Sequence, residues 1–213
     1  MSVSTADIVA DPDVSEPCRI IGNERTHADH RERALGFWLY LMSDAILFAI
    51  LFANYGVLLY GVAGGPRPHE VFSLDTAAYE TAALLISSLT FGFVSICALS
   101  GKRFAAIFWL LVTMGLGACF LYFEFHEFAG LVAEGSGPWR SGFLSGFFAL
   151  VGAHGLHVSV GMIMLAVLVL QLLVKGTTEP VLSRLYRVGL FWHFLDIIWI
   201  GIFSFVYLPG VLP

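Results

Sequence analysis

Charged residues are scarce in this chain. Asp, Glu, Lys and Arg make up 13% of its 213 residues, whereas soluble domains carry about 25%. Hydrophobic residues make up 58%, and the mean hydropathy is +0.82. The composition therefore indicates an integral membrane protein.

Basic residues and cysteines are also few. The 11 Lys and Arg residues are outnumbered by 16 Asp and Glu residues, so the chain lacks the basic surface that nucleic acids require. We predict no nucleic-acid partner. Cys18, Cys97 and Cys119 are far apart and form no C-x-x-C motif, so we predict neither a disulfide framework nor a zinc site.

The first 33 residues differ from the rest. They mix both charge signs with Pro, Ser and Asp, and they contain no apolar core after a basic start, so we expect no secretory signal. We predict that 1–33 is a polar, mobile cytoplasmic tail and that 34–213 forms the membrane domain.

Five apolar runs are long enough to cross a bilayer, which takes about 20 residues in a helix. A helix satisfies its own backbone hydrogen bonds in lipid, so we predict an all-α bundle of five transmembrane helices. The connections, such as "SGKR" and "KGTTEPVLSRLYR", are rich in Gly, Pro and charge and are predicted to be loops. The predicted spans are 34–60, 77–99, 104–128, 142–174 and 188–209.

The basic residues predict the orientation, because Lys and Arg accumulate on the cytoplasmic side. With the N-terminus in the cytoplasm, nine basic residues lie inside and only Arg67 and Arg140 lie outside. We therefore predict a cytoplasmic N-terminus and a periplasmic C-terminus. The inner residues are Arg19, Arg25, Arg31, Arg33, Lys102, Arg103, Lys175, Arg184 and Arg187.

Few ionisable side chains lie within the predicted spans. A charge at the bilayer centre is costly, so each needs a partner or stays neutral, and such residues are functional candidates. Each also has a simpler interpretation as a hydrogen bond between helices. They are Asp44, Glu80, Glu124, His126, Glu127, His154, His157, His193 and Asp196.

Six of these residues form i, i+3 pairs. The pairs are Glu124 with Glu127, His154 with His157, and His193 with Asp196. Carboxylates and imidazoles at this spacing can hold a di-iron centre in a helical bundle, so a free-standing di-iron membrane oxidase is one alternative. However, the Glu-x-x-His motif is missing, and the predicted spans place the three pairs at different depths. We therefore predict no metal site.

Small residues favour another role for His157. Gly142, Gly146, Ala149 and Ala153 share its helix face, and small residues let helices approach closely. The pattern predicts that His157 joins two helices through a hydrogen bond.

A proton relay through Asp44, Glu80 or Asp196 is a further alternative. It would suit a small proton-coupled transporter, although the chain has no internal repeat of the kind that many transporters contain. Catalytic motifs such as G-x-S-x-G are absent, and we predict no catalytic residue in this chain.

Several segments resemble subunit III of the haem-copper terminal oxidases, and the five-span layout is most similar to the cytochrome bo-type ubiquinol oxidases. The similarity runs from Leu35 to Leu208 and leaves the tail out. The segments are "GFWLYLMSDAILFAILFANYGVL", "AGGP", "SGFLSGFFALVGAHGLHVSVG" and "FWHFLDIIWIGIFSFVYL".

The resemblance implies a non-catalytic, cofactor-free subunit of a proton-pumping complex in the bacterial inner membrane, which oxidises ubiquinol and reduces oxygen to water. It implies haem b, haem o and copper in subunit I, contact with subunits I, II and IV, and bound phospholipids. It places Glu80 at the family's intramembrane glutamate near a lipid-holding cleft. We group Asp44 with Glu80 as a lipid-binding or intramembrane polar residue. The implied polar ties between helices are Glu124, Glu127, His154, His157, His193 and Asp196.

Overall fold

A computed structural model of the chain describes residues 15–62 and 74–211, in which helices joined by short turns are the only regular secondary structure. The long helices are α1 (Ser15–Leu58), α3 (Leu74–Leu99), α4 (Arg103–Ala133), α5 (Gly142–Lys175) and α6 (Glu179–Ile202). A π-helical turn, η1 (Phe203–Tyr207), and a short helix, α7 (Leu208–Val211), continue from α6. The "AGGP" segment and Arg67 lie outside the described residues.

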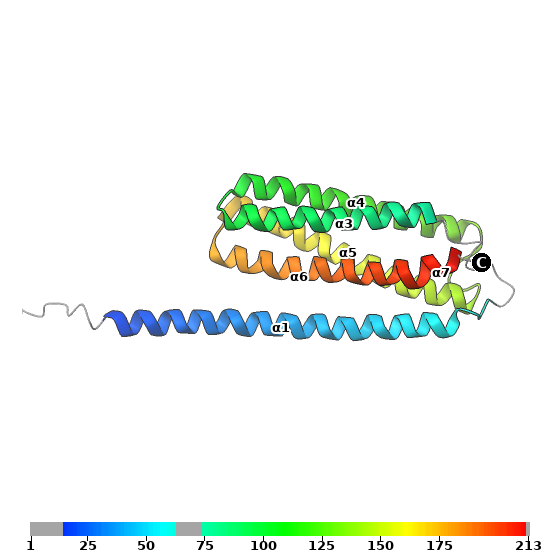
Figure 1. The fold of residues 1–213 in the computed structure, drawn as a ribbon, viewed down its shortest axis with the longest axis horizontal. Helices are drawn as coiled ribbons and strands as arrows, with labels where there is room; N and C mark the ends of the chain where they lie inside the picture. The colour runs from blue at the N-terminus through cyan, green and yellow to red at the C-terminus, as the bar shows by residue number, and fades with distance from the viewer. Residues whose placement is uncertain (1–14, 63–73, 212–213) are drawn as a thin grey trace, which may run out of the picture. The chain divides into compact units, whose positions relative to one another are not determined.

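The chain divides into two units, Met1–Tyr40 and Leu41–Pro213. Within the second unit, α3, α4, α5 and α6 lie side by side (Figure 1). Contacts join α3 to α4, α4 to α5, α5 to α6 and α6 back to α3. The four helices therefore close into a ring in which each packs against two others.

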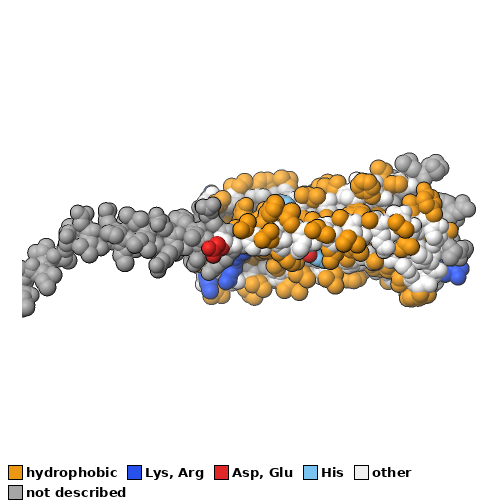
Figure 2. All heavy atoms as spheres, turned by 90° about the horizontal axis from the view of Figure 1, so that it is seen from below, with side chains coloured by type: hydrophobic (Ala, Val, Ile, Leu, Met, Phe, Trp, Pro, Cys, Tyr) orange, Lys and Arg blue, Asp and Glu red, His pale blue; other side chains and the backbone are white. Residues whose placement is uncertain are grey.

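Five helices in the described residues are long and apolar enough to span a membrane, which confirms the predicted all-α bundle. The exposed surface of the bundle is also largely apolar. On the face in Figure 2, hydrophobic side chains cover most of the described surface, and Lys and Arg lie near its ends. Exposed large side chains such as Leu111, Ile163 and Leu170 are suited to contact with lipid.

Short polar segments end the helices where the sequence predicts turns. Gly101 and Gly176 adopt positive φ angles of 71° and 66° just after α3 and α5, a conformation that glycine favours. The Ser141 side chain accepts a hydrogen bond from the Leu144 backbone N–H at 3.2 Å, which caps the first turn of α5.

Two of the predicted span ends are wrong. α4 continues five residues past 128 to Ala133, because "AGLVA" is apolar and the first strong helix breaker is Gly135, with φ 78°. α6 begins at Glu179 rather than 188. Much of the predicted loop is therefore helical.

The early start of α6 has a clear physical reason. Pro180 lies in the first turn, where a missing N–H costs no hydrogen bond. Val181, Leu185 and Val188 then repeat on one buried face, while Arg184 is exposed. The segment is an amphipathic helix end, and its charges obscure the apolar periodicity in the sequence.

The predicted N-terminal tail also contains helix, since α1 begins at Ser15. The division of the chain at residue 33 stays a prediction.

Candidate functional site

Two buried tryptophans of α6 bind polar side chains of α3. The Trp192 indole N–H donates to the Ser87 hydroxyl, and the Trp199 indole N–H donates to the Thr81 hydroxyl, each at 3.0 Å. Both indoles are almost completely buried. A tryptophan inside a bundle needs such a partner for its N–H, so these bonds fix the register of α6 against α3.

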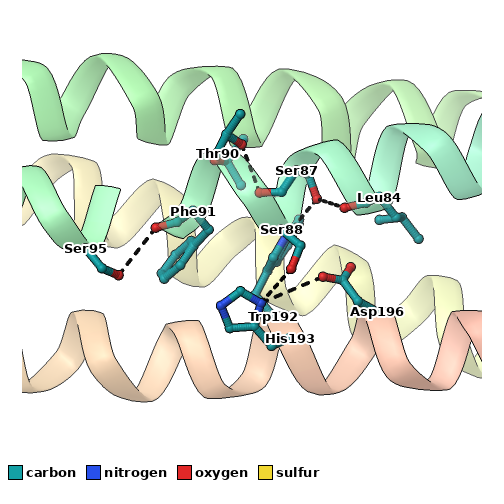
Figure 3. Close-up of polar contacts among 10 residues, drawn as sticks. Leu84, Ser87, Ser88, Thr90, Phe91, Ser95, Trp192, His193 and Asp196 are labelled. Carbon is teal, nitrogen blue, oxygen red and sulfur yellow. Dashed lines mark hydrogen bonds and ion pairs between the residues drawn. The ribbon is translucent and has the colours of Figure 1, made fainter. Parts of the chain in front are cut away.

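His193 makes a third contact between the same two helices. Its Nδ1 lies 2.7 Å from the Ser88 hydroxyl and 3.9 Å from an Asp196 carboxyl oxygen (Figure 3). Its ring also packs edge-on against Phe91. His193 and Asp196 therefore form one polar group at the α3–α6 contact.

Asp44 and His157 face each other across α1 and α5. His157 Nδ1 lies 2.6 Å from the Ala153 carbonyl oxygen, and a carbonyl only accepts, so Nδ1 carries a proton. The other ring nitrogen lies 3.7 Å from an Asp44 carboxyl oxygen. The two side chains are therefore within ion-pair range of each other but too far apart for a direct hydrogen bond.

Gly142 and Gly146 lie where α1 and α5 come close. A Cβ at Gly146 would lie 3.4 Å from the Tyr55 Cα, and one at Gly142 would lie 3.3 Å from Leu58. The small-residue face that leads to His157 therefore contacts α1, as the sequence pattern suggests.

Three glutamates lie near the contact between α3 and α4, two of them buried and Glu127 half-buried. Glu80 is fully buried and Glu124 is 4% exposed, and both are close enough to Glu127 for their charges to interact. The Tyr207 hydroxyl donates to a Glu127 carboxyl oxygen at 3.1 Å. Tyr207 lies in the η1 turn, so the π-helical geometry positions this donor beside Glu127.

Gly155 makes room for Glu124. A Cβ at this position would lie 2.7 Å from the Glu124 carboxyl carbon. The carboxyl group of α4 is therefore pressed directly against the α5 backbone, next to His154.

Glu124 lies deeper in its helix than the predicted spans placed it. The predicted end of the third span placed Glu124 close to the outer boundary and far above the histidines of the fourth. Because α4 ends at Ala133, nine residues beyond Glu124, the carboxyl lies roughly 14 Å inside the helix end. Glu124 and the His154 region share one level.

His154 is fully buried among aromatic rings. Its ring lies 5.2 Å from that of Trp199 and 5.7 Å from that of Phe120. Neither ring nitrogen has a hydrogen-bond partner among the described residues. His154 therefore contributes aromatic packing between α4, α5 and α6.

Seven of the eight predicted site residues thus lie in three groups: Asp44 with His157, His193 with Asp196, and the glutamates Glu80, Glu124 and Glu127. The eighth, His154, packs among aromatic rings. No group of three or more metal-binding side chains is present within the described residues. The sequence patterns did not indicate four further residues that make these contacts: Thr81, Ser87, Ser88 and Tyr207. The hydroxyl side chains of Thr81, Ser87 and Ser88 within one apolar span could have indicated a polar contact with another helix.

The comparisons with known proteins agree with this architecture. A family model described as "Cytochrome c oxidase subunit III" matches residues 5–211. The chain belongs to this family. The resemblance noted in the sequence motifs is thereby confirmed, and the predicted tail from residue 5 onward falls inside the match.

Similar curated proteins include subunits III of quinol oxidases. The cytochrome bo(3) ubiquinol oxidase subunit 3 of Pseudomonas putida is 53% identical over 87% of this chain and 90% of its own length. That of Pseudomonas aeruginosa is 48% identical over 90% and 93%. The quinol oxidase subunit 3 of Bacillus subtilis is 40% identical over 85% and 89%.

These findings identify a subunit III of the haem-copper oxidases. Its bacterial relatives and five apolar helices make it a multi-pass protein of the bacterial inner membrane, as predicted. As an oxidase subunit III, it works with other subunits. The family match does not favour the di-iron oxidase or the transporter alternative.

Proposed function

We propose that this chain is the non-catalytic subunit III of a proton-pumping ubiquinol oxidase complex, which oxidises ubiquinol and reduces oxygen to water. The observation that carries the proposal is the 53% identity to a ubiquinol oxidase subunit 3 over 87% of the chain. The 40% identity to a quinol oxidase subunit of Bacillus subtilis supports a quinol as the electron donor.

In the proposed complex, haem b, haem o and copper are held in subunit I, and ubiquinol is its substrate. Subunit I contacts this chain directly, and subunits II and IV complete the assembly. This chain holds no cofactor and supports assembly, lipid binding and sustained turnover of subunit I. Its apolar exterior and internal polar contacts support a structural role.

The polar residues inside the bundle have two proposed roles. Asp44 and Glu80 are proposed to bind lipid or to act as intramembrane polar groups. Glu124, Glu127, His154, His157, His193 and Asp196 are proposed as polar ties between helices. The contacts from His193 to α3 and from Glu127 to η1 support this role, whereas the aromatic surroundings of His154 favour packing.

We also propose that the N-terminus is cytoplasmic and the C-terminus periplasmic. The nine basic residues on one side against two on the other support this orientation.

Native purification followed by a haem spectrum and a subunit count tests the proposed function. We expect this chain in constant ratio with a haem-containing subunit, and quinol-dependent oxygen consumption by the complex. A chain that purifies alone and contains two irons, or that transports a solute in vesicles, would contradict the proposal.

Replacing His157 by Ala tests the supporting role. We expect subunit III retention or prolonged turnover to fall while the initial rate of quinol oxidation stays near normal. Intramembrane polar contacts contribute about 1 kcal/mol, or roughly a fivefold change in the bound fraction. Asp196→Ala should behave alike, and Ile163→Ala, at an exposed α5 position, is the control. Immediate haem loss from an intact complex would contradict this role.

A further inference from the structure

His193 is exposed where a membrane protein normally buries its polar groups. Its side chain is 46% exposed, whereas Glu80 and His154 are completely buried. His193 is also the central residue of the span Glu179–Tyr207. An imidazole at this depth is costly against hydrocarbon, and such residues almost always face protein or water.

The other exposed intramembrane histidine differs in depth. His126 lies seven residues before the end of α4 at Ala133, roughly 10 Å from it, and it packs beside Tyr122. A polar ring so near a helix end reaches the interfacial region. His193 is too far from either end of its span to do so.

Part of the hydrogen-bonding capacity of the His193 group is unused. Nδ1 faces Ser88 and Asp196, and Figure 3 shows the second ring nitrogen pointing away from both. Behind the ring, Asp196 is 6% exposed, and neither of its carboxyl oxygens has a hydrogen bond within the described part of the chain. The Asp196 end of this polar pair is therefore buried in the bundle, and the His193 end is exposed on the bundle surface.

The surface around this nitrogen has room for another helix. We define the α3–α6 seam as Leu85, Ser88 and Gly92 on α3 with His193 and Ile197 on α6. Ser88 and Gly92 are small and one helical turn apart, and a Cβ on Gly92 would meet nothing within 4 Å. Small residues at this spacing let a second helix approach closely, and the exposed Leu85 and Ile197 flank the polar centre.

We propose that the α3–α6 seam docks a transmembrane helix of another subunit, which brings a hydroxyl, amide or carboxyl side chain to the second ring nitrogen of His193. The partner is a protein helix because lipid chains at mid-membrane offer no hydrogen-bonding group. The inference rests on the proposed function, since it requires that this chain belong to a complex.

Site-specific photocross-linking in membranes that contain the whole complex tests the docking. A photoreactive residue replaces Ile197 or Leu85, and the control position is Ile163 on α5, which is 64% exposed against 67% for Ile197. We expect both seam positions to form adducts with another subunit. Adducts with lipid alone at both seam positions, in a complex that retains subunit III, would overturn the docking and leave the proposed function standing. Absence of this chain from the complex would overturn both.

The polar contact itself is tested by His193→Leu and His193→Gln. We expect the leucine variant to lower cross-linking from Ile197 and the retention of subunit III in detergent several-fold. The glutamine variant keeps a hydrogen-bonding group and should restore both. If the two variants behave alike, His193 does not bind a partner side chain and the inference is wrong.

Discussion

Adding a methyl group at Gly155, as in Gly155→Ala, should push against the buried carboxyl group of Glu124. A Cβ there would lie 2.7 Å from the Glu124 carboxyl carbon, and both residues are buried between α4 and α5. We expect Gly155→Ala to destabilise the bundle by about 1–3 kcal/mol, the usual cost of overpacking a core. The measurement is the temperature at which subunit III dissociates from the purified complex.

Gly115→Ala is the matched control. A Cβ at Gly115 would meet nothing within 4 Å, and alanine is favoured over glycine inside a helix. Its dissociation temperature should stay the same or rise. An equal loss in both variants would show that helix packing at Gly155 is not the cause.

Sequence patterns predict that two helices come close, but they do not determine what surrounds each side chain. The small-residue face leading to His157 indicated a close helix contact, and Gly146 does lie against the α1 backbone at Tyr55. The same motif contains His154, whose ring packs among Phe120 and Trp199. Two histidines three residues apart point into different surroundings, and only the neighbouring helices decide which.

At the scale of helices, the contact between α3 and α6 should be measurable as a pairwise coupling. Trp199 donates to Thr81 at 3.0 Å. In a double-mutant cycle with Trp199→Phe and Thr81→Val, we expect a coupling free energy of about 0.6 kcal/mol, a typical value for hydrogen bonds between membrane helices. The measurement is unfolding of the subunit within the complex in a denaturing detergent.

Thr90→Val provides the control for that cycle. Thr90 pairs with Thr113 of α4 at 2.8 Å and lies nine residues along α3 from Thr81. Its coupling to Trp199→Phe should be close to zero. A coupling as large as that of Thr81 would mean that the cycle reports general loosening of the bundle.

The ends of the helices were harder to predict than their existence. Apolar length alone identified all five spans, because a bilayer demands a continuous apolar helix. The first turns of α6 carry Arg184 and Arg187 beside Pro180, so hydropathy did not reveal them. The buried face of Val181 and Leu185 holds this segment in the helix.

For the whole molecule, the proposed orientation makes a direct prediction. Alkaline phosphatase, which folds only in the periplasm, should be active when fused after Pro213 and inactive when fused after Thr178, between α5 and α6. Green fluorescent protein should give the opposite pattern. The reason is the excess of Lys and Arg on the side that includes Lys102 and Lys175.

A reversed pattern, with activity after Thr178 and none after Pro213, would contradict the orientation. Expression levels of both fusions must be compared by immunoblot so that a degraded fusion is not mistaken for a cytoplasmic one.

The sequence by itself determined the membrane location, the number of spans and the family. Length and apolarity suffice for the first two, and the motifs around His154 and His193 carried the third. The tertiary structure decided which polar groups meet: Glu124 with Gly155, Asp44 with His157, and His193 with Ser88. Those contacts depend on where the helices end and how they are rotated, which are set by packing between helices far apart in the chain.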